Sequence, residues 1–367
     1  MAGLTFIQKN ELFSYSGTNC VRNDYFHNDC HLCVDICPKD AIKVVRNRIT
    51  LFGNECINCA ACMGSCPTEA LSLEGFDTNA FVKDLPHKEN PFISCKKESV
   101  CLGAYDVHHY ITMGLSCTST ITCDLAHCGD CALNQDKKVE EFIRGEIARA
   151  NDFLAACEIE KQIQLQEEKP EEENSKRALF RKAITKAKDT IEKGDEEVEK
   201  SSLTMTKDYQ KSTSFDGLPL KFALLKEALR SHMPNITKTS HATNFGIFAQ
   251  KQIVFESCTN CGECVQFCPT AALTSTSDKQ GINFNAGNCI ACGICDHICK
   301  PNAISSAEGI DLVKVAYNRA ENLVHYDMVM CQECRCPYPY RGGDPICDRC
   351  ADYRKDFAHI FTLAKDM

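Results

Sequence analysis

Residues 258–273 read CTNCGECVQFCPTAAL, and the spacing of their cysteines decides how this chain folds. Two residues separate Cys258 from Cys261 and Cys261 from Cys264, and three separate Cys264 from Cys268, which has a proline directly after it. Cysteines at this two-residue spacing wrap one side of a cubic [4Fe–4S] cluster. The proline prevents a helix from continuing, so that the cysteine before it is carried to a second cluster. The stretch therefore predicts part of a domain that holds two clusters.

The same pattern occurs at three other places along the chain. The segments are CIACGICDHICKPNAI (289–304), CINCAACMGSCPTEAL (56–71) and CHLCVDICPKDAI (30–42). They form two pairs, and a β-like run lies between the members of each pair, at 41–52 and at 282–285. An internal repeat of this kind indicates that one supersecondary unit is used twice. We therefore predict two ferredoxin-like 2[4Fe–4S] modules.

Exchange of the cysteine that precedes proline assigns ligands to three complete sets. The sets are Cys258, Cys261, Cys264 with Cys299; Cys289, Cys292, Cys295 with Cys268; and Cys56, Cys59, Cys62 with Cys37. Zinc also binds Cys-x2-Cys pairs, but zinc sites do not need three closely spaced cysteines and a distant fourth. The pattern therefore favours iron.

The fourth set is incomplete, because Cys30, Cys33 and Cys66 lack a partner at the expected spacing. Position 27 is occupied by His27, and imidazole is able to bind iron and raise its potential. Cys20, ten residues before Cys30, is the alternative, and thiolate is the commoner ligand of such clusters. We predict Cys20, with His27 as the open alternative.

Cys20 and Arg22, followed by Cys30-x2-Cys33-x3-Cys37-Pro38, resemble a family of cytoplasmic polyferredoxins in which C-x-R precedes a shortened cluster motif. CKKESVCLG (95–103), HCGDC (127–131) and SKRALFRKA (175–183) fit the same family. The resemblance implies an electron carrier or wiring subunit for an oxidoreductase, often a formate dehydrogenase-type molybdenum or tungsten enzyme.

Two further cysteine groups have less regular spacing. Cys95, Cys101, Cys128 and Cys131 are predicted to bind a fifth [4Fe–4S] cluster, with zinc or no metal as alternatives, while Cys117 and Cys123 are expected to be small buried hydrophobes. Cys331, Cys334, Cys347 and Cys350 form two Cys-x2-Cys knuckles typical of a zinc ribbon. Cys336 is a spare thiol that would suit an iron–sulfur cluster there instead.

The predicted fold class is α+β. We expect a ferredoxin module at 1–85, a cysteine-rich module at 86–133, a helical charged linker at 134–245, a second ferredoxin module at 246–315 and a metal-binding tail at 316–367. Hydrophobic periodicity predicts a long helix over 134–168 and an amphipathic helix over 216–232. Residues 158–201 are rich in Glu and Lys, and their basic stretch at 176–188 is either a solvated face or a docking face.

Composition narrows the class of function. The chain has 28 cysteines, mostly in Cys-x2-Cys groups that suit shared metals better than disulfides, so we expect a reduced, cytoplasmic protein. A net charge of −9 gives no case for nucleic acid, and no apolar stretch approaches the roughly 20 residues that span a bilayer. Radical-SAM, phosphate-loop and dinucleotide motifs are missing, so the chain is not expected to be an enzyme. We expect single-electron transfer to or from a redox partner, and the alternative is an assembly factor that binds a metalloenzyme.

Overall fold

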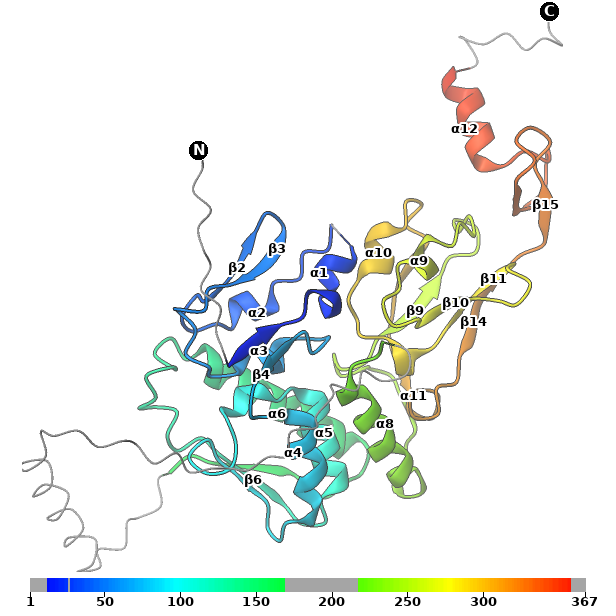
Figure 1. Ribbon diagram of the computed structural model, residues 1–367. Coiled ribbons are helices and arrows are strands. Elements are labelled where there is room, and N and C mark those ends of the chain that lie inside the picture. The colour runs from blue at the N-terminus through cyan, green and yellow to red at the C-terminus, as the bar shows by residue number, and fades with distance from the viewer. Residues whose placement is uncertain (1–11, 26, 169–216, 358–367) are drawn as a thin grey trace, which may run out of the picture.

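Short helices and small sheets make up the computed structural model, which describes residues 12–25, 27–168 and 217–357 (Figure 1). This mixture agrees with the predicted α+β class. The basic stretch at 176–188 and the SKRALFRKA segment lie outside the described residues. None of the described helices is both long enough and apolar enough to cross a membrane.

The first unit is built from two antiparallel strand pairs. Strand β1 (Phe13–Tyr15) pairs with β4 (Leu71–Leu73), and β2 (Ile42–Val45) forms a hairpin with β3 (Arg48–Leu51). Arg46 and Asn47 form the hairpin turn with φ of 50° and 61°, as a two-residue type I′ turn requires. The helices are α1 (Val21–Asp24), α2 (Leu32–Asp35) and α3 (Ala61–Ser65).

The second unit repeats this order of elements. Strand β9 (Gln250–Ile253) pairs with β12 (Ile304–Ala307), and β10 (Leu273–Ser275) forms a hairpin with β11 (Gly281–Phe284). Helices α9 (Glu263–Gln266) and α10 (Ile294–Ile298) lie within the two cysteine runs. Strand β14 (Glu321–His325) adds a third strand to the hairpin. The shared order supports the predicted repeat.

A parallel sheet lies between the two units in the sequence. It contains β5 (Phe92–Ile93), β6 (Ile121–Asp124) and β7 (Ile163–Gln166), with α4 (Thr78–Asp84), α5 (Val107–Ser116) and α6 (Lys138–Ala156) nearby. The helix predicted over 134–168 therefore ends early. Glu158 has φ of 59°, and the N–H groups of Glu158 and Ile159 bond back to the carbonyls of Ala155 and Leu154. This is a Schellman stop without its usual glycine.

Helix α8 (Leu220–His232) ties the two units together, at the position where an amphipathic helix was predicted. Its first N–H group, on Leu220, donates to Glu69 of the first unit at 2.8 Å. Further along, Lys226 donates to Asn288 of the second unit at 3.1 Å, and Arg230 donates to the carbonyl of Ala316 at 2.9 Å. The predicted linker is therefore, at this end, a packed element that fixes the two units.

The remaining elements complete the second unit and the tail. They are β8 (Ser240–His241) with β13 (Ile310–Asp311), α11 (Leu312–Ala316), β15 (Met328–Met330) with β16 (Pro337–Pro339), and α12 (Asp348–Phe357). The largest buried cluster of apolar side chains includes residues of the first unit, the central sheet and the second unit. The tail has a small core of its own around Cys331, Tyr338 and Cys347.

Candidate metal centres

Four cysteines of the second unit line one hollow, and we call them the Cys258 set: Cys258, Cys261, Cys264 and Cys299. Cys299 comes from the other half of the unit, so the structure places it where the predicted exchange requires. Pro301 and Ile282 lie in the same lining. The four thiols therefore converge on one space from both halves of the unit.

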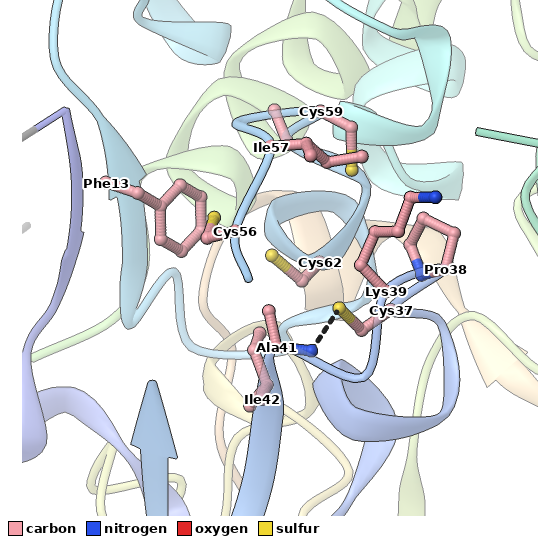
Figure 2. Close-up of a pocket in the computed structure, with 11 residues that line it drawn as sticks. Phe13, Cys37, Pro38, Lys39, Ala41, Ile42, Cys56, Ile57, Cys59 and Cys62 are labelled. Atoms are coloured by element: carbon pink, nitrogen blue, oxygen red, sulfur yellow. Dashed lines mark hydrogen bonds between the residues drawn. The ribbon is translucent and has the colours of Figure 1, made fainter. Parts of the chain in front are cut away.

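The first unit contains the equivalent Cys56 set: Cys37, Cys56, Cys59 and Cys62. Figure 2 shows the four thiols around one hollow, with Phe13, Ile42 and Pro38 beside them. Cys37 belongs to the other cysteine run of this unit, as the exchange predicts. Most of the lining beside the thiols is apolar, and solvent exposure is one of the factors that set cluster potential.

Two more sets are identified by thiols that raise the pKa of one another. Burial raises the pKa of Cys289 to about 12, with further contributions from Cys292 and Cys268. These three and Cys295 form the Cys289 set. Burial likewise raises the pKa of Cys33 to about 12, and the neighbours that raise it further are Cys66, Cys30 and Cys20. These four form the Cys30 set, so Cys20 stands with the three predicted cysteines.

His27 lies differently from Cys20. Cys20 is buried at the start of α1, next to the hydroxyl of Tyr15, whereas the His27 side chain is exposed and its ring lies 5.6 Å from that of Tyr25. Arg22 gives the C-x-R motif a structural role, because its Nε donates to the carbonyl of Cys30 at 2.9 Å and holds α1 against that loop. This geometry favours Cys20 as the fourth thiol.

Each turn that follows a Cys-Pro or Cys-Lys-Pro step has the same backbone. The third residue after the cysteine has positive φ in all four turns: Asp40, Glu69, Ala271 and Asn302. In three of the turns the next residue, an alanine, donates its N–H to the cysteine sulfur: Ala41 to Cys37 at 3.3 Å, Ala70 to Cys66 at 3.3 Å and Ala303 to Cys299 at 3.2 Å. An N–H aimed at a thiolate stabilises its negative charge and tunes a bound cluster. The sequence contains these alanines, but it does not indicate that their N–H groups contact the cysteine sulfurs.

The Cys95 set consists of Cys95, Cys101, Cys128 and Cys131. Burial raises the pKa of Cys101 to about 12, and nearby Cys59, Cys95 and Cys128 raise it further. Burial also raises the pKa of Cys128 to about 11, and nearby Cys95 and Cys131 raise it further. The structure therefore gathers the four predicted cysteines next to the Cys56 set. Cys117, Cys123 and Cys157 are fully buried in the main core, as small hydrophobes would be.

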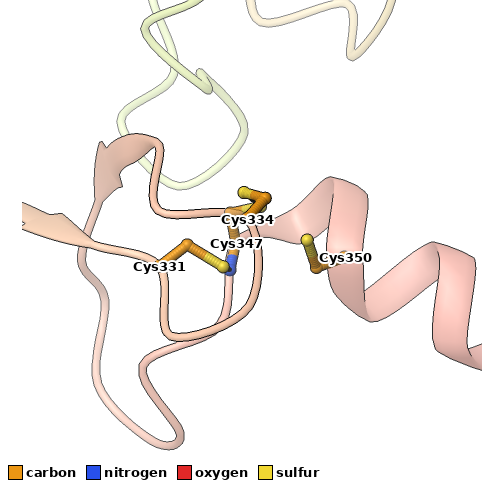
Figure 3. Close-up of side chains that lie close together, drawn as sticks. All are labelled: Cys331, Cys334, Cys347 and Cys350. Atoms are coloured by element: carbon orange, nitrogen blue, oxygen red, sulfur yellow. Dashed lines mark hydrogen bonds between the residues drawn. The ribbon is translucent and has the colours of Figure 1, made fainter. Parts of the chain in front are cut away.

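The tail set, Cys331, Cys334, Cys347 and Cys350, is tighter than the others (Figure 3). Its sulfurs all lie within 4.8 Å of one another, and those of Cys334 and Cys347 are 3.6 Å apart. Four thiolates at 2.3 Å from a tetrahedral ion are about 3.8 Å apart. Within the described ranges no other His, Cys, Asp and Glu group is this close. The tail set therefore suits one ion, and the wider sets suit a larger group. Cys336 is exposed and lies outside the set.

Two buried lysines lie beside the cysteine sets. Lys251 is 4% exposed and donates to Asp296 at 2.6 Å. Burial raises the pKa of Cys295, and the positive charge of Lys251 offsets part of this increase. This lowering is larger than the increase that Asp296 adds. Lys221, 1% exposed, donates to the Cys66 carbonyl at 2.8 Å and to Asp106 at 2.7 Å. The Cys30 and Cys289 sets therefore each have a buried ammonium group nearby.

Comparison with protein families agrees with this geometry. Residues 250–300 match the model of the 4Fe-4S dicluster domain. The matched segment contains every cysteine of the Cys258 and Cys289 sets. The match and the clustered cysteines together support an iron–sulfur protein of the ferredoxin type with a role in electron transfer.

Proposed function

We propose that the chain relays single electrons through several [4Fe–4S] clusters to or from a partner oxidoreductase. The observation that carries this proposal is the exchange of cysteines between paired sets in both units, with backbone N–H groups aimed at the exchanged thiols. The Cys258, Cys289, Cys56 and Cys30 sets would each hold one cube, and the Cys95 set a fifth. A bound cube takes up or gives one electron, and its protein surroundings set the potential.

The iron content tests this proposal directly. Protein prepared without oxygen is expected to contain about 16–20 irons per chain, four for each cube, and dithionite should bleach its broad visible absorption. Colorimetric iron analysis and a redox titration measure the two quantities. About eight irons would mean that one unit is empty, and unreducible iron would contradict a relay.

The partner that we propose is a formate dehydrogenase-type molybdenum or tungsten oxidoreductase, with this chain as its electron carrier rather than as an enzyme. The C-x-R motif supports this choice through the family that it resembles, and Arg22 holds the loop of Cys30 in place. An assembly factor is the alternative function. A relay must increase electron flow from the purified, mature partner to an acceptor, whereas an assembly factor would leave that rate unchanged.

For the tail set we propose a structural zinc ion. Four thiolates leave no position for water or substrate, so the site would stabilise residues 326–352 without redox chemistry. Cys350→Ser is expected to remove about one zinc per chain and to leave the iron content unchanged. Cys336→Ser is the matched control and should retain zinc. Plasma mass spectrometry of the full-length proteins measures both metals, and loss of about four irons in Cys350→Ser would identify a cluster instead.

A further inference from the structure

We propose that electrons cross between the two ferredoxin-like units at one junction, where the Cys30 set meets the Cys289 set, so that the five sets form a single line. This inference rests on the relay function proposed above and adds the order of its sites. The order is the Cys95, Cys56, Cys30, Cys289 and Cys258 sets.

The junction is a small apolar cluster distinct from the main core. Its buried members are Val21, Leu218, Phe222, Ile290 and Ile294, and Cys30 and Cys292 both pack against it. Helix α1 of the first unit and α10 of the second lie side by side there (Figure 1). The ring of Tyr25 also meets that of Phe267 edge-on, with centroids 6.0 Å apart. The two units therefore meet where Cys30 of the Cys30 set and Cys292 of the Cys289 set lie.

A single buried side chain links these two cysteines. The Oδ1 atom of Asn28 accepts the N–H of Cys30 at 2.9 Å, and its Nδ2 donates to the carbonyl of Cys292 at 3.2 Å. Asn28 is 3% exposed, so no bulk water separates the two backbones at this point. This loop is also the one that departs from the usual cysteine spacing. The departure removes the cysteine expected at position 27, and the next residue, Asn28, bonds to the other unit.

The remaining links follow from shared elements. Within each unit the two sets exchange a cysteine, Cys37 and Cys66 in the first and Cys268 and Cys299 in the second. Helix α3, which carries Cys62, packs its backbone against the turn Leu102–Ala104 that follows Cys101. A Cβ on Gly64 would stand 2.2 Å from the carbonyl oxygen of Gly103. The Cys56 set is therefore the neighbour of the Cys95 set.

The solvent exposure of the cysteines agrees with this order of the five sets. Among the cysteines of the five sets, which all lie in the described ranges, Cys95 and Cys261 alone are exposed. They belong to the first and the last set of the line, so both ends reach the surface, while the cysteines of the inner sets are buried or half-buried. At the junction one electron leaves the reduced side and the other side gains it, and no bond is made or broken.

The test uses full-length protein with the inner pair of cubes isolated. Cys62→Ala with Cys264→Ala removes a ligand from the Cys56 and Cys258 sets and leaves the Cys30 and Cys289 sets complete. After dithionite reduction, electron paramagnetic resonance should show the splitting that two adjacent reduced cubes impose on each other. The complementary Cys33→Ala with Cys292→Ala protein also carries Cys101→Ala, which empties the neighbouring Cys95 set. It keeps the Cys56 and Cys258 cubes as the outer pair and should show no splitting between the units.

A junction variant then tests the route. Asn28→Asp keeps the acceptor for Cys30 but places a carboxylate against the Cys292 carbonyl, which should push the two loops apart, so the splitting should become smaller at unchanged iron content. Asn285→Asp is the matched control, because Asn285 also accepts an N–H two residues later, from Gly287, and donates to a distant carbonyl, that of Asn318. It should leave the splitting intact.

The proposal is overturned if the inner pair gives two independent signals, if the outer pair is split, or if Asn28→Asp changes nothing. A chain whose cubes cannot be reduced at all would overturn the relay function itself, and with it this proposal.

Discussion

Replacing Cys20 by alanine is expected to remove one whole cube, or about four irons per chain, and His27→Ala is expected to remove none. Cys20 is 8% exposed and stands among Cys30, Cys33 and Cys66, whereas the ring of His27 faces outward beside Tyr25. Iron analysis and the resonance spectrum of the two purified variants measure the difference. Because the other sets do not use Cys20, their signals should persist.

Cys157→Ala is the control for loss of a buried thiol. Cys157 is buried, like Cys20, but it packs in the main core and belongs to no cysteine set. The iron content of the Cys157→Ala protein should therefore equal that of the wild type. The assignment of the fourth ligand is wrong if His27→Ala loses iron while Cys20→Ala keeps all of it.

Gly64→Ala is expected to be the most damaging small substitution in the first unit. The added Cβ would stand 2.2 Å from the carbonyl oxygen of Gly103 and 2.9 Å from the carbonyl carbon of Ala104, and both are backbone atoms that do not rotate away. Overpacking of this kind costs about 3 kcal/mol. At about 2 °C per kcal/mol the midpoint of thermal unfolding should fall by roughly 6 °C. Scanning calorimetry under anaerobic conditions measures it.

Gly145→Ala is the matched control. Gly145 lies on the exposed face of α6, and a Cβ there would meet nothing within 4 Å. Alanine should therefore stabilise the helix by about 0.5–1 kcal/mol. Equal midpoints for Gly64→Ala and the wild type would show that α3 does not press against the turn after Cys101.

The Cys258, Cys289 and Cys56 sets were predictable because ligand spacing is a local property of the sequence, whereas the spacing left the fourth ligand of the Cys30 set open. Cys258, Cys261 and Cys264 lie on one loop, and the proline after Cys268 signals the exchange without any knowledge of the tertiary structure. The end of α6 was not predictable in this way, since Glu158 adopts the left-handed conformation that usually marks a glycine. Strand β5 has only two residues, too few for any periodicity to show, so the parallel sheet was missed.

Helix α8 shows a second limit. Lys221 and Lys226 suggest solvated positions in an amphipathic pattern, yet the structure buries both. Their partners are Asp106, 115 residues away from Lys221, and Asn288, 62 residues away from Lys226. Pairing at such separations leaves no trace in a single sequence, so the role of this helix in joining the units became visible only in the fold.

The buried ammonium groups of Lys221 and Lys251 have a consequence for storage of charge. Each ammonium group offsets a neighbouring carboxylate, Asp106 beside Lys221 and Asp296 beside Lys251, so that no uncompensated negative charge opposes an added electron at the Cys30 and Cys289 sets. Two adjacent sites that each accept an electron would let the protein hold two electrons at once. Such a buffer would match one-electron carriers to an enzyme that oxidises or reduces its substrate by two electrons at a time. Lys251→Met leaves the carboxylate of Asp296 uncompensated, so in a coulometric titration one electron equivalent should move to a lower potential.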